Sequence, residues 1–307
     1  MKGVPVAIAS NHGERSWGAR AESEIAFWVK AARPGFWLTA TWFYLLPFGR
    51  SASGEGGHLA LGLAFWLGLI YVGFPLGMAI YAANDLTDSA TDAINPRKDS
   101  FLFGARPTAS QIKRLPWIIT LIQLPFLIAF WVLWGPKALA WFVAVLGATA
   151  VYNFQPTRTK DRPLLDMASQ AGYLLVFVLA DWVRGVPSSW QLYVFGALFA
   201  MHSHGFGQIL DVEPDARAGR RTTAVVLGVL RTKWLIVGLL LFECVLARAL
   251  PGKSYLPPLL FLGALGFAVD ALFLWRERSY PSWGAPAFFI GWNAALLLDL
   301  CWNWLRV

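Results

Sequence analysis

Residues 59–92 read LALGLAFWLGLIYVGFPLGMAIYAANDLTDSATD. The first part of this stretch, 59–83, has no charged side chain and is long enough to cross a bilayer as a helix, which takes about 20 residues. Three aspartates, Asp85, Asp88 and Asp92, follow at once. Carboxylates beside a bilayer cost free energy and usually serve a function. The stretch therefore predicts a transmembrane helix that ends in a functional acidic cluster.

The whole chain has the composition of a membrane protein. Hydrophobic residues make up 57% and charged residues 14% of its 307 residues, with a mean hydropathy of +0.50. A soluble domain is roughly 25% charged. The 17 Trp residues suit a chain with many membrane–water interfaces. The net charge of +8 comes largely from loops between apolar segments, so we expect membrane lipid as a partner and no nucleic acid.

Apolar segments divide the chain into nine candidate membrane helices. We place them at 35–50, 59–83, 115–134, 138–154, 164–183, 189–210, 233–250, 255–274 and 283–304. We expect an interfacial helix over 22–34 and a cytoplasmic tail over 1–21. The sequence thus predicts an all-α, polytopic membrane protein with nine transmembrane helices in a single domain, 22–307.

A second acidic cluster, Asp211-Val212-Glu213-Pro214-Asp215, ends another apolar segment. On helices, the spacings within 85–92 and 211–215 would each place the aspartates on one face. Like charges on one face repel, and a divalent cation removes that penalty. Mg²⁺ prefers oxygen ligands, commonly one or two carboxylates together with phosphate oxygens. The predicted metal ligands are Asp85, Asp88, Asp92, Asp211 and Asp215. The simpler alternative is a solvated helix end, but two clusters on one membrane face favour metal binding.

Positive charge orients the predicted helices. With the tail on one side of the membrane, 20 of the 26 Lys and Arg residues fall on that same side. The side richer in Lys and Arg is normally cytoplasmic. We therefore expect a cytoplasmic N-terminus and an active site that opens to the cytoplasm, in the cell membrane of a bacterium or an archaeon.

Basic and polar residues follow both acidic clusters. A diphosphate carries several negative charges, which metal ions and Arg or Lys side chains together neutralise. The residues that we predict to bind a diphosphate are Asn84, Arg97, Lys98, Tyr152, Arg158, Lys160 and Arg221. For each cation alone, membrane orientation is the competing explanation.

The two acidic clusters fit paired motifs, NDxxDxxxD over 84–92 and DxxxD over 211–215. With the loop Tyr152-Asn153-Phe154-Gln155-Pro156-Thr157-Arg158-Thr159-Lys160, the chain resembles the UbiA superfamily of intramembrane prenyltransferases. Asn95-Pro96-Arg97-Lys98 is similar to the lycopene elongase branch. The family often has an acid before its second motif, where this chain has His204 and Gln208.

The resemblance implies a fold and a reaction. The nine helices would enclose a central, lipid-accessible cavity. Mg²⁺ held by the catalytic residues Asp88, Asp92, Asp211 and Asp215 would help a polyprenyl diphosphate to lose its diphosphate. The allylic carbocation would then alkylate a hydrophobic acceptor. Two alternatives stay open: a terpene cyclase that acts on the diphosphate alone, and a non-catalytic carrier of diphosphate lipids. The sequence assigns no role to His202, His204, Glu243 or Asp270.

Overall fold

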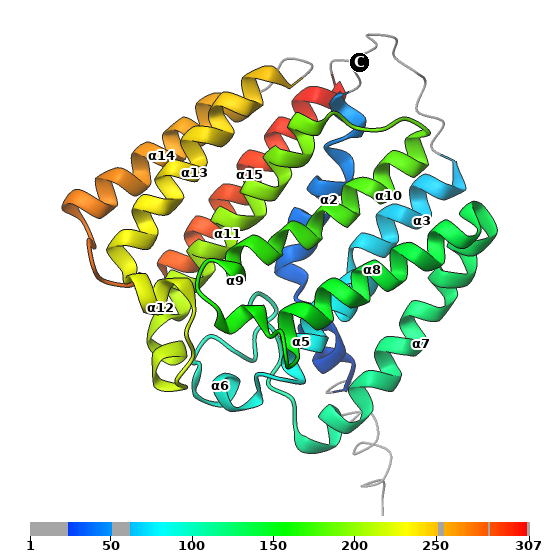
Figure 1. Ribbon diagram of the computed structural model, residues 1–307, viewed down its shortest axis with the longest axis horizontal. Helices are drawn as coiled ribbons and strands as arrows, with labels where there is room; N and C mark the ends of the chain where they lie inside the picture. Colours follow the sequence, from blue (N-terminus) through cyan, green and yellow to red (C-terminus); the bar gives the residue numbers. More distant parts are fainter. Residues whose placement is uncertain (1–23, 51–61, 251–254, 282, 306–307) are drawn as a thin grey trace, which may run out of the picture.

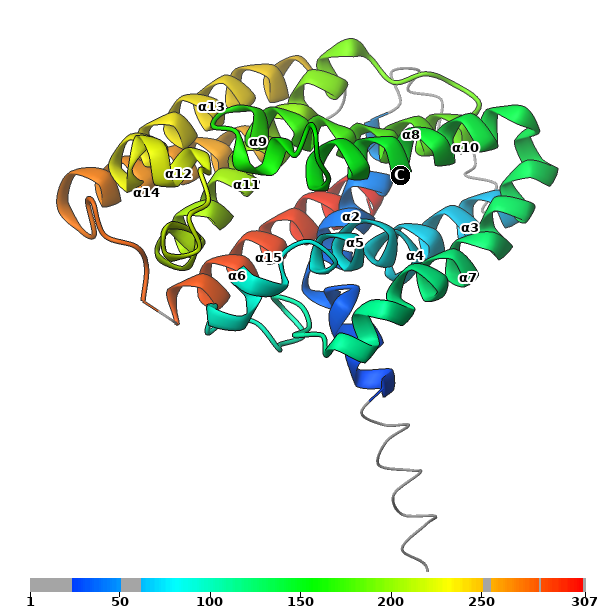
Figure 2. The ribbon, with the colours of Figure 1, turned by 60° about the horizontal axis from the view of Figure 1, so that its bottom comes forward.

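The structure is a computed structural model that describes residues 24–50, 62–250, 255–281 and 283–305. Within these residues the chain forms helices and no β-strand. The long helices lie side by side, and the short helices α5, α6, α9 and α12 gather toward one end of the molecule (Figure 1). In Figure 2, with this end turned forward, α5 and α6 lie in front of α2 and α15. The all-α prediction is confirmed.

All nine predicted ranges contain helix in the part that the structure describes. The first is η1 (Pro34–Phe36), α2 (Trp37–Leu45) and η2 (Phe48–Arg50), and the second is α3 (Leu63–Val72), α4 (Phe74–Gly77), η3 (Met78–Ala82) and α5 (Ala83–Asp85). The next three are α7 (Ala109–Trp134), α8 (Pro136–Asn153), and α9 (Leu165–Ala168) with η5 (Ser169–Leu174) and α10 (Leu175–Arg184). The last four are α11 (Trp190–Arg217), α13 (Val229–Ala249), α14 (Leu256–Phe273) and α15 (Gly284–Leu305).

Shorter helices join these segments at the end that carries the acidic clusters. They are the helix 24–31, α6 (Ser89–Ile94), η4 (Thr159–Asp161) and α12 (Thr223–Leu227). The helix 24–31 falls within the predicted interfacial segment. The predicted tail, 1–21, and the start of the second predicted span lie outside the described residues.

Three helices in the described part are long and apolar enough to cross a membrane by length and composition. They are Leu63–Asp85, Ala109–Trp134 and Leu256–Phe273, and the shorter Pro286–Trp302 is also apolar. Among the other segments, α9–η5–α10 is broken, and α11 carries buried polar residues at His202 and Gln208. Nine membrane crossings therefore stay a prediction.

The local sequence explains two helix boundaries that position the site. α7 begins before its predicted range because Thr108 and Gln111 form a capping box, in which each side chain bonds the other residue's backbone N–H. The helix that leads to the first acidic cluster breaks at Gly73, where α3 ends and α4 begins with Pro75 in its first turn. A Cβ at Gly77 would lie 2.4 Å from the Ala32 carbonyl oxygen, so this helix packs closely against the chain that enters α2.

Candidate active site

A cavity of about 330 Å³ runs between the helices. Charged side chains line one end of it, among them Asp88, Asp92, Asp211, Asp215, Arg97, Lys98 and Arg220. Apolar and aromatic side chains line the rest, including Phe43, Val145, Phe199, Phe288 and Trp292. Such a cavity suits an amphiphile with an anionic head and a hydrocarbon body.

The first acidic cluster is not one continuous helix. α5 ends at Asp85, the chain turns at Leu86 and Thr87, and Asp88 directly precedes α6, which begins at Ser89. The expectation that Asp85, Asp88 and Asp92 share one helical face is therefore wrong. The spacing rule holds only while the helix continues, and here the turn separates the first aspartate from the others.

Asp85 lies behind the cavity wall. Its side chain is fully buried and pairs with Arg33 at 3.3 Å and with Lys98 at 2.9 Å. Lys98 also pairs with Asp92 at 2.8 Å, so one lysine holds two carboxylates of the cluster. Burial raises the pKa of Asp92 to about 6, against the lowering effect of Lys98. Asp88 and Asp92 line the cavity, whereas Asp85 does not.

Lys160 fixes Asp88 from a different part of the chain. Its Nζ lies 2.6 Å from Asp88 and also donates to Asn84 at 2.8 Å and to Asn153 at 3.0 Å. Burial lowers the pKa of Lys160 to about 8, although Asp88 acts in the opposite direction. The lysine thus joins the loop after α8 to the first acidic cluster, and it carries little solvent around its charge.

The second acidic cluster lies on one helix. α11 continues through Pro214 to Arg217, so Asp211 and Asp215 are one turn apart as predicted. Asp211 is held by Arg97 and accepts a hydrogen bond from Asn95 at 2.7 Å. The side chain of Asp211 is 36% exposed, whereas that of Asp215 is buried.

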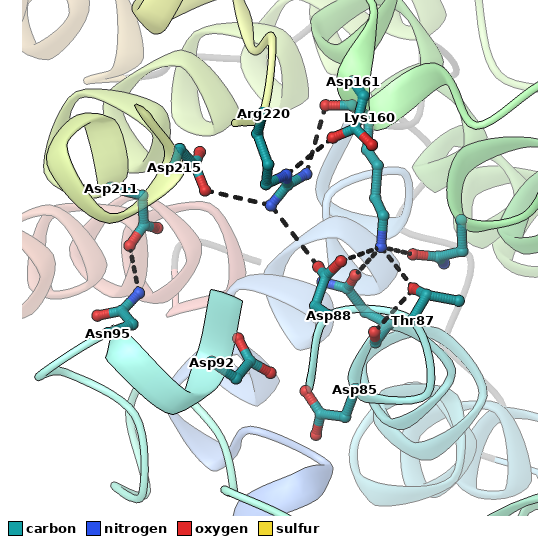
Figure 3. Close-up of polar contacts among 12 residues, drawn as sticks. Asp85, Thr87, Asp88, Asp92, Asn95, Lys160, Asp161, Asp211, Asp215 and Arg220 are labelled. Carbon is teal, nitrogen blue, oxygen red and sulfur yellow. Dashed lines mark hydrogen bonds and ion pairs between the residues drawn. The ribbon is translucent and has the colours of Figure 1, made fainter. Parts of the chain in front are cut away.

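Arg220 connects the two clusters (Figure 3). Its guanidinium pairs with Asp215 at 3.3 Å, with Asp161 at 2.8 Å and with Asp88 at 3.7 Å. Burial lowers the pKa of Arg220, but the surrounding carboxylates outweigh it and raise that pKa overall. One carboxylate from each cluster, Asp88 and Asp215, therefore faces a shared cation, as the sequence could not reveal.

The neighbouring Arg221 lies elsewhere. Its side chain is exposed and lines a second, shallow pocket together with Arg158, Asp161 and Arg217. Among the two adjacent arginines it is Arg220, and not the predicted Arg221, that reaches the cavity. Arg158 lies between the two pockets, 3.5 Å from Asp88.

Aromatic hydroxyls line the boundary between the charged and apolar parts of the cavity. Tyr173 donates to Tyr81 at 2.8 Å, and Arg33 lies over the Tyr81 ring at 5.0 Å. Tyr152, which we predicted to bind diphosphate, lies 3.3 Å from His204 Nε2 and lines the same cavity.

Several site residues escaped the sequence analysis. Asp161 holds both Arg158 and Arg220, and its only signal was an acid inside a basic loop. Asp166 is fully buried and accepts hydrogen bonds from Gln208 at 2.6 Å and from the Thr223 backbone at 2.6 Å. These bonds fix the start of the chain that follows Arg220.

The carboxylates suit Mg²⁺, although the described residues contain no ready-made group of three His, Cys, Asp or Glu ligands. Four of them, Asp88, Asp92, Asp211 and Asp215, line the charged end of the cavity. All the donors are hard oxygens, and Mg²⁺ commonly completes its shell with water and phosphate oxygens. The donor set therefore fits a metal that arrives with a phosphorylated ligand.

The fold and this site define a helical membrane protein that holds acidic and basic side chains over an apolar cavity. The sequence profile of the UbiA prenyltransferase family matches residues 35–293. The chain belongs to this family, and it is accordingly a membrane-bound prenyltransferase. The family prediction is confirmed.

Individual relatives show which members of the family this chain is similar to. A lycopene elongase/hydratase of Corynebacterium glutamicum is 26% identical over 281 residues, covering 87% of this chain and 94% of that protein. Another, of Haloarcula japonica, is 30% identical over 217 residues, covering 70% and 72%. A UbiA homolog from Archaeoglobus fulgidus, solved bound to GPP and Mg²⁺, has a TM-score of 0.65 at 17% identity and covers 91% of this chain and 98% of its own. This last likeness concerns the fold.

Proposed function

We propose that this protein transfers a prenyl group from an allylic polyprenyl diphosphate to a hydrophobic acceptor within the membrane, with Mg²⁺ as cofactor. The observation that carries the proposal is the cavity itself, which joins a charged end to an aromatic and apolar body. The Archaeoglobus fulgidus homolog, solved with GPP and Mg²⁺ and with DMAPP and Mg²⁺, supports this choice of donor and metal.

The charged end would bind the diphosphate. Mg²⁺ held by Asp88, Asp92, Asp211 and Asp215 would supply Lewis-acid neutralisation of the leaving group. Arg97, Lys98 and Arg220 now pair with these same carboxylates. They lie where phosphate oxygens would enter, so they would turn from the carboxylates to the diphosphate. Arg is well suited to this role because its planar fork matches phosphate oxygens.

The apolar part would handle the cation. When the C–O bond breaks, its electron pair leaves with the diphosphate, and an electron-rich bond of the acceptor supplies the electrons of the new C–C bond. The walls must exclude water, which would otherwise capture the cation. Aromatic faces at Phe199 and Trp292 would stabilise positive charge.

We propose an acyclic polyene such as lycopene as the acceptor. The support is the names of the relatives, lycopene elongase/hydratases from bacteria and archaea that match most of this chain. The terminal double bond of such a polyene is an electron-rich alkene, and its length suits a cavity open to lipid.

We propose that the chain crosses the membrane nine times and that the charged end of the cavity opens to the cytoplasm. The charge asymmetry of the chain supports this orientation, because 20 of the 26 Lys and Arg residues fall on one side of the predicted helices. Cysteine substitution at Ser100, in the loop of the first acidic cluster, tests it. Labelling by an impermeant thiol reagent in intact cells would contradict the orientation, and labelling confined to opened cells would agree with it.

Product analysis by mass spectrometry tests the reaction. Purified protein would be incubated with Mg²⁺ and with dimethylallyl, geranyl or geranylgeranyl diphosphate, each with and without lycopene or a membrane lipid extract. We expect a prenylated adduct that requires the acceptor, with release of diphosphate. A cyclic hydrocarbon without acceptor would support the terpene cyclase instead. Intact diphosphate in every incubation would support the carrier.

A further inference from the structure

A buried pair of ionisable side chains lies beside the apolar part of the cavity, and one member of the pair, His202, lines it. His202 on α11 and Glu243 on α13 are both buried, and His202 Nδ1 lies 2.7 Å from Glu243 Oε1. Glu243 Oε2 is buried and accepts no hydrogen bond from the described residues. Burying an ionisable group inside a membrane protein costs free energy, so such groups usually serve a function. A purely structural pair would leave one oxygen of the Glu243 carboxylate without a hydrogen bond.

We assign the ring proton of His202 to Nδ1. An ionised carboxylate accepts and does not donate, so with Glu243 ionised Nδ1 carries the proton that Glu243 accepts, and Nε2 keeps its lone pair. Nε2 lies 3.4 Å from the Ser203 hydroxyl, and both His202 and Ser203 line the cavity. The imidazole thus presents a basic nitrogen to the cavity, with a carboxylate behind it to stabilise the imidazolium.

The pair stands beside the hydrocarbon region and not beside the diphosphate. His202 precedes Asp211 by nine residues on the same helix, which is about 14 Å along its axis. The His202 ring contacts Phe199 and Trp292, with centroids 4.9 and 5.7 Å away. These are the aromatic walls that would surround a carbocation.

We propose that His202 is the base that ends the reaction and that Glu243 is its positioning residue. This inference rests on the proposed function and adds to it. After the acceptor's double bond has attacked the prenyl carbon, the acceptor carries a positive charge. An adjacent C–H bond then breaks and its electrons form a new double bond. This releases one proton, which His202 Nε2 accepts and returns to water after the product has left.

The experiment measures coupling, defined as adduct formed per diphosphate released. The main variant, His202→Phe with Glu243→Leu, replaces both members by apolar residues, so neither charge is left unpaired. We expect coupling to fall at least tenfold while diphosphate release and the KM for diphosphate stay within threefold, with free prenyl alcohol replacing adduct. Glu243→Gln alone keeps a hydrogen-bonding partner but no charge and should lie between the double variant and the wild type.

The Lys233–Asp270 pair gives a matched control. It is a buried ion pair of 2.8 Å between α13 and α14, and neither residue lines the cavity. Lys233→Met with Asp270→Asn should leave coupling unchanged. Normal coupling in a folded His202→Phe/Glu243→Leu protein would overturn the inference and leave the proposed function standing. A wild-type protein that forms no adduct would overturn both.

Discussion

The two acidic clusters reach the same cavity from helices of different kinds. Asp211 and Asp215 lie one turn apart on the unbroken α11. Asp85, Asp88 and Asp92 are spread over α5, a turn and α6. The continuous helix sets the spacing of its two carboxylates through backbone geometry, and Arg97 and Arg220 pair with them. The broken segment has no such continuous backbone and also depends on cations outside it, on Lys98 in the chain that follows it and on Lys160 in the loop after α8. Two acidic motifs of one site can therefore be positioned differently, one mainly by the geometry of its helix and the other mainly by side-chain contacts.

The largest expected effect tests what the clusters share. Asp88→Asn and Asp215→Asn should each lower turnover by about 10³-fold, since loss of roughly 4 kcal/mol of transition-state stabilisation gives that factor. Diphosphate release in detergent-purified protein measures it. Asp99→Asn is the control, because Asp99 is an exposed carboxylate on the first cluster's loop whose pair with Lys30 is worth little. If Asp88→Asn or Asp215→Asn kept the wild-type turnover, the substituted aspartate would not be a metal ligand.

The next effect tests the long-range support of the first cluster. Lys160→Met removes the buried charge that holds Asp88, Asn84 and Asn153 together. We expect turnover to fall about 10²-fold, in the range of supporting residues around metal ligands. Lys30→Met removes a cation that pairs with the exposed Asp99 and does not line the cavity, so it should change turnover less than twofold. Equal effects of the two substitutions would show that the first cluster does not depend on Lys160.

A third comparison uses the adjacent arginines that follow the second cluster. Arg220→Gln should lower turnover about 10- to 100-fold and raise the KM for diphosphate, because Arg220 contacts both clusters. Arg221→Gln should stay within twofold, because Arg221 is exposed outside the cavity. Steady-state kinetics with one diphosphate decides it, and a larger effect at Arg221 would contradict the structural assignment.

The smallest effect on turnover is expected inside the first cluster. Asp85→Asn should lower turnover less than tenfold and leave the Mg²⁺ dependence unchanged, because Asp85 does not line the cavity. It should destabilise the protein by about 3 kcal/mol, since Arg33 and Lys98 lose a buried partner. Thermal unfolding and Mg²⁺ titration of turnover measure the two quantities. A metal requirement shifted as far as in Asp88→Asn would make Asp85 a ligand.

The features that could be predicted from the sequence are those that depend on neighbouring residues. Apolar runs located helices such as α7 and α14, and helical spacing placed Asp211 and Asp215 correctly. The sequence could not predict the break after Asp85, which depends on how that segment packs. Nor could it choose Arg220 over Arg221, because neighbouring side chains of one type differ only in the direction the backbone gives them. Asp161 and Asp166 each contact a partner more than 40 residues away, Arg220 and Gln208, and helical spacing does not predict such contacts.

The cations that already sit on the carboxylates have a consequence for the order of events. With Lys98, Lys160, Arg97 and Arg220 in place, the resting pocket is close to electrically balanced and gives a bare metal ion little reason to enter. A metal ion that arrives bound to diphosphate also brings negative charge. The Lys and Arg side chains can then pair with the diphosphate when they leave the carboxylates. Metal and diphosphate should thus load as one complex, so Mg²⁺ would act on turnover through the amount of that complex and not through a site filled in advance. Tight metal uptake by the protein alone, seen in equilibrium dialysis, would contradict this order. The ion pairs of the resting site would therefore open only when the metal and the diphosphate bind together.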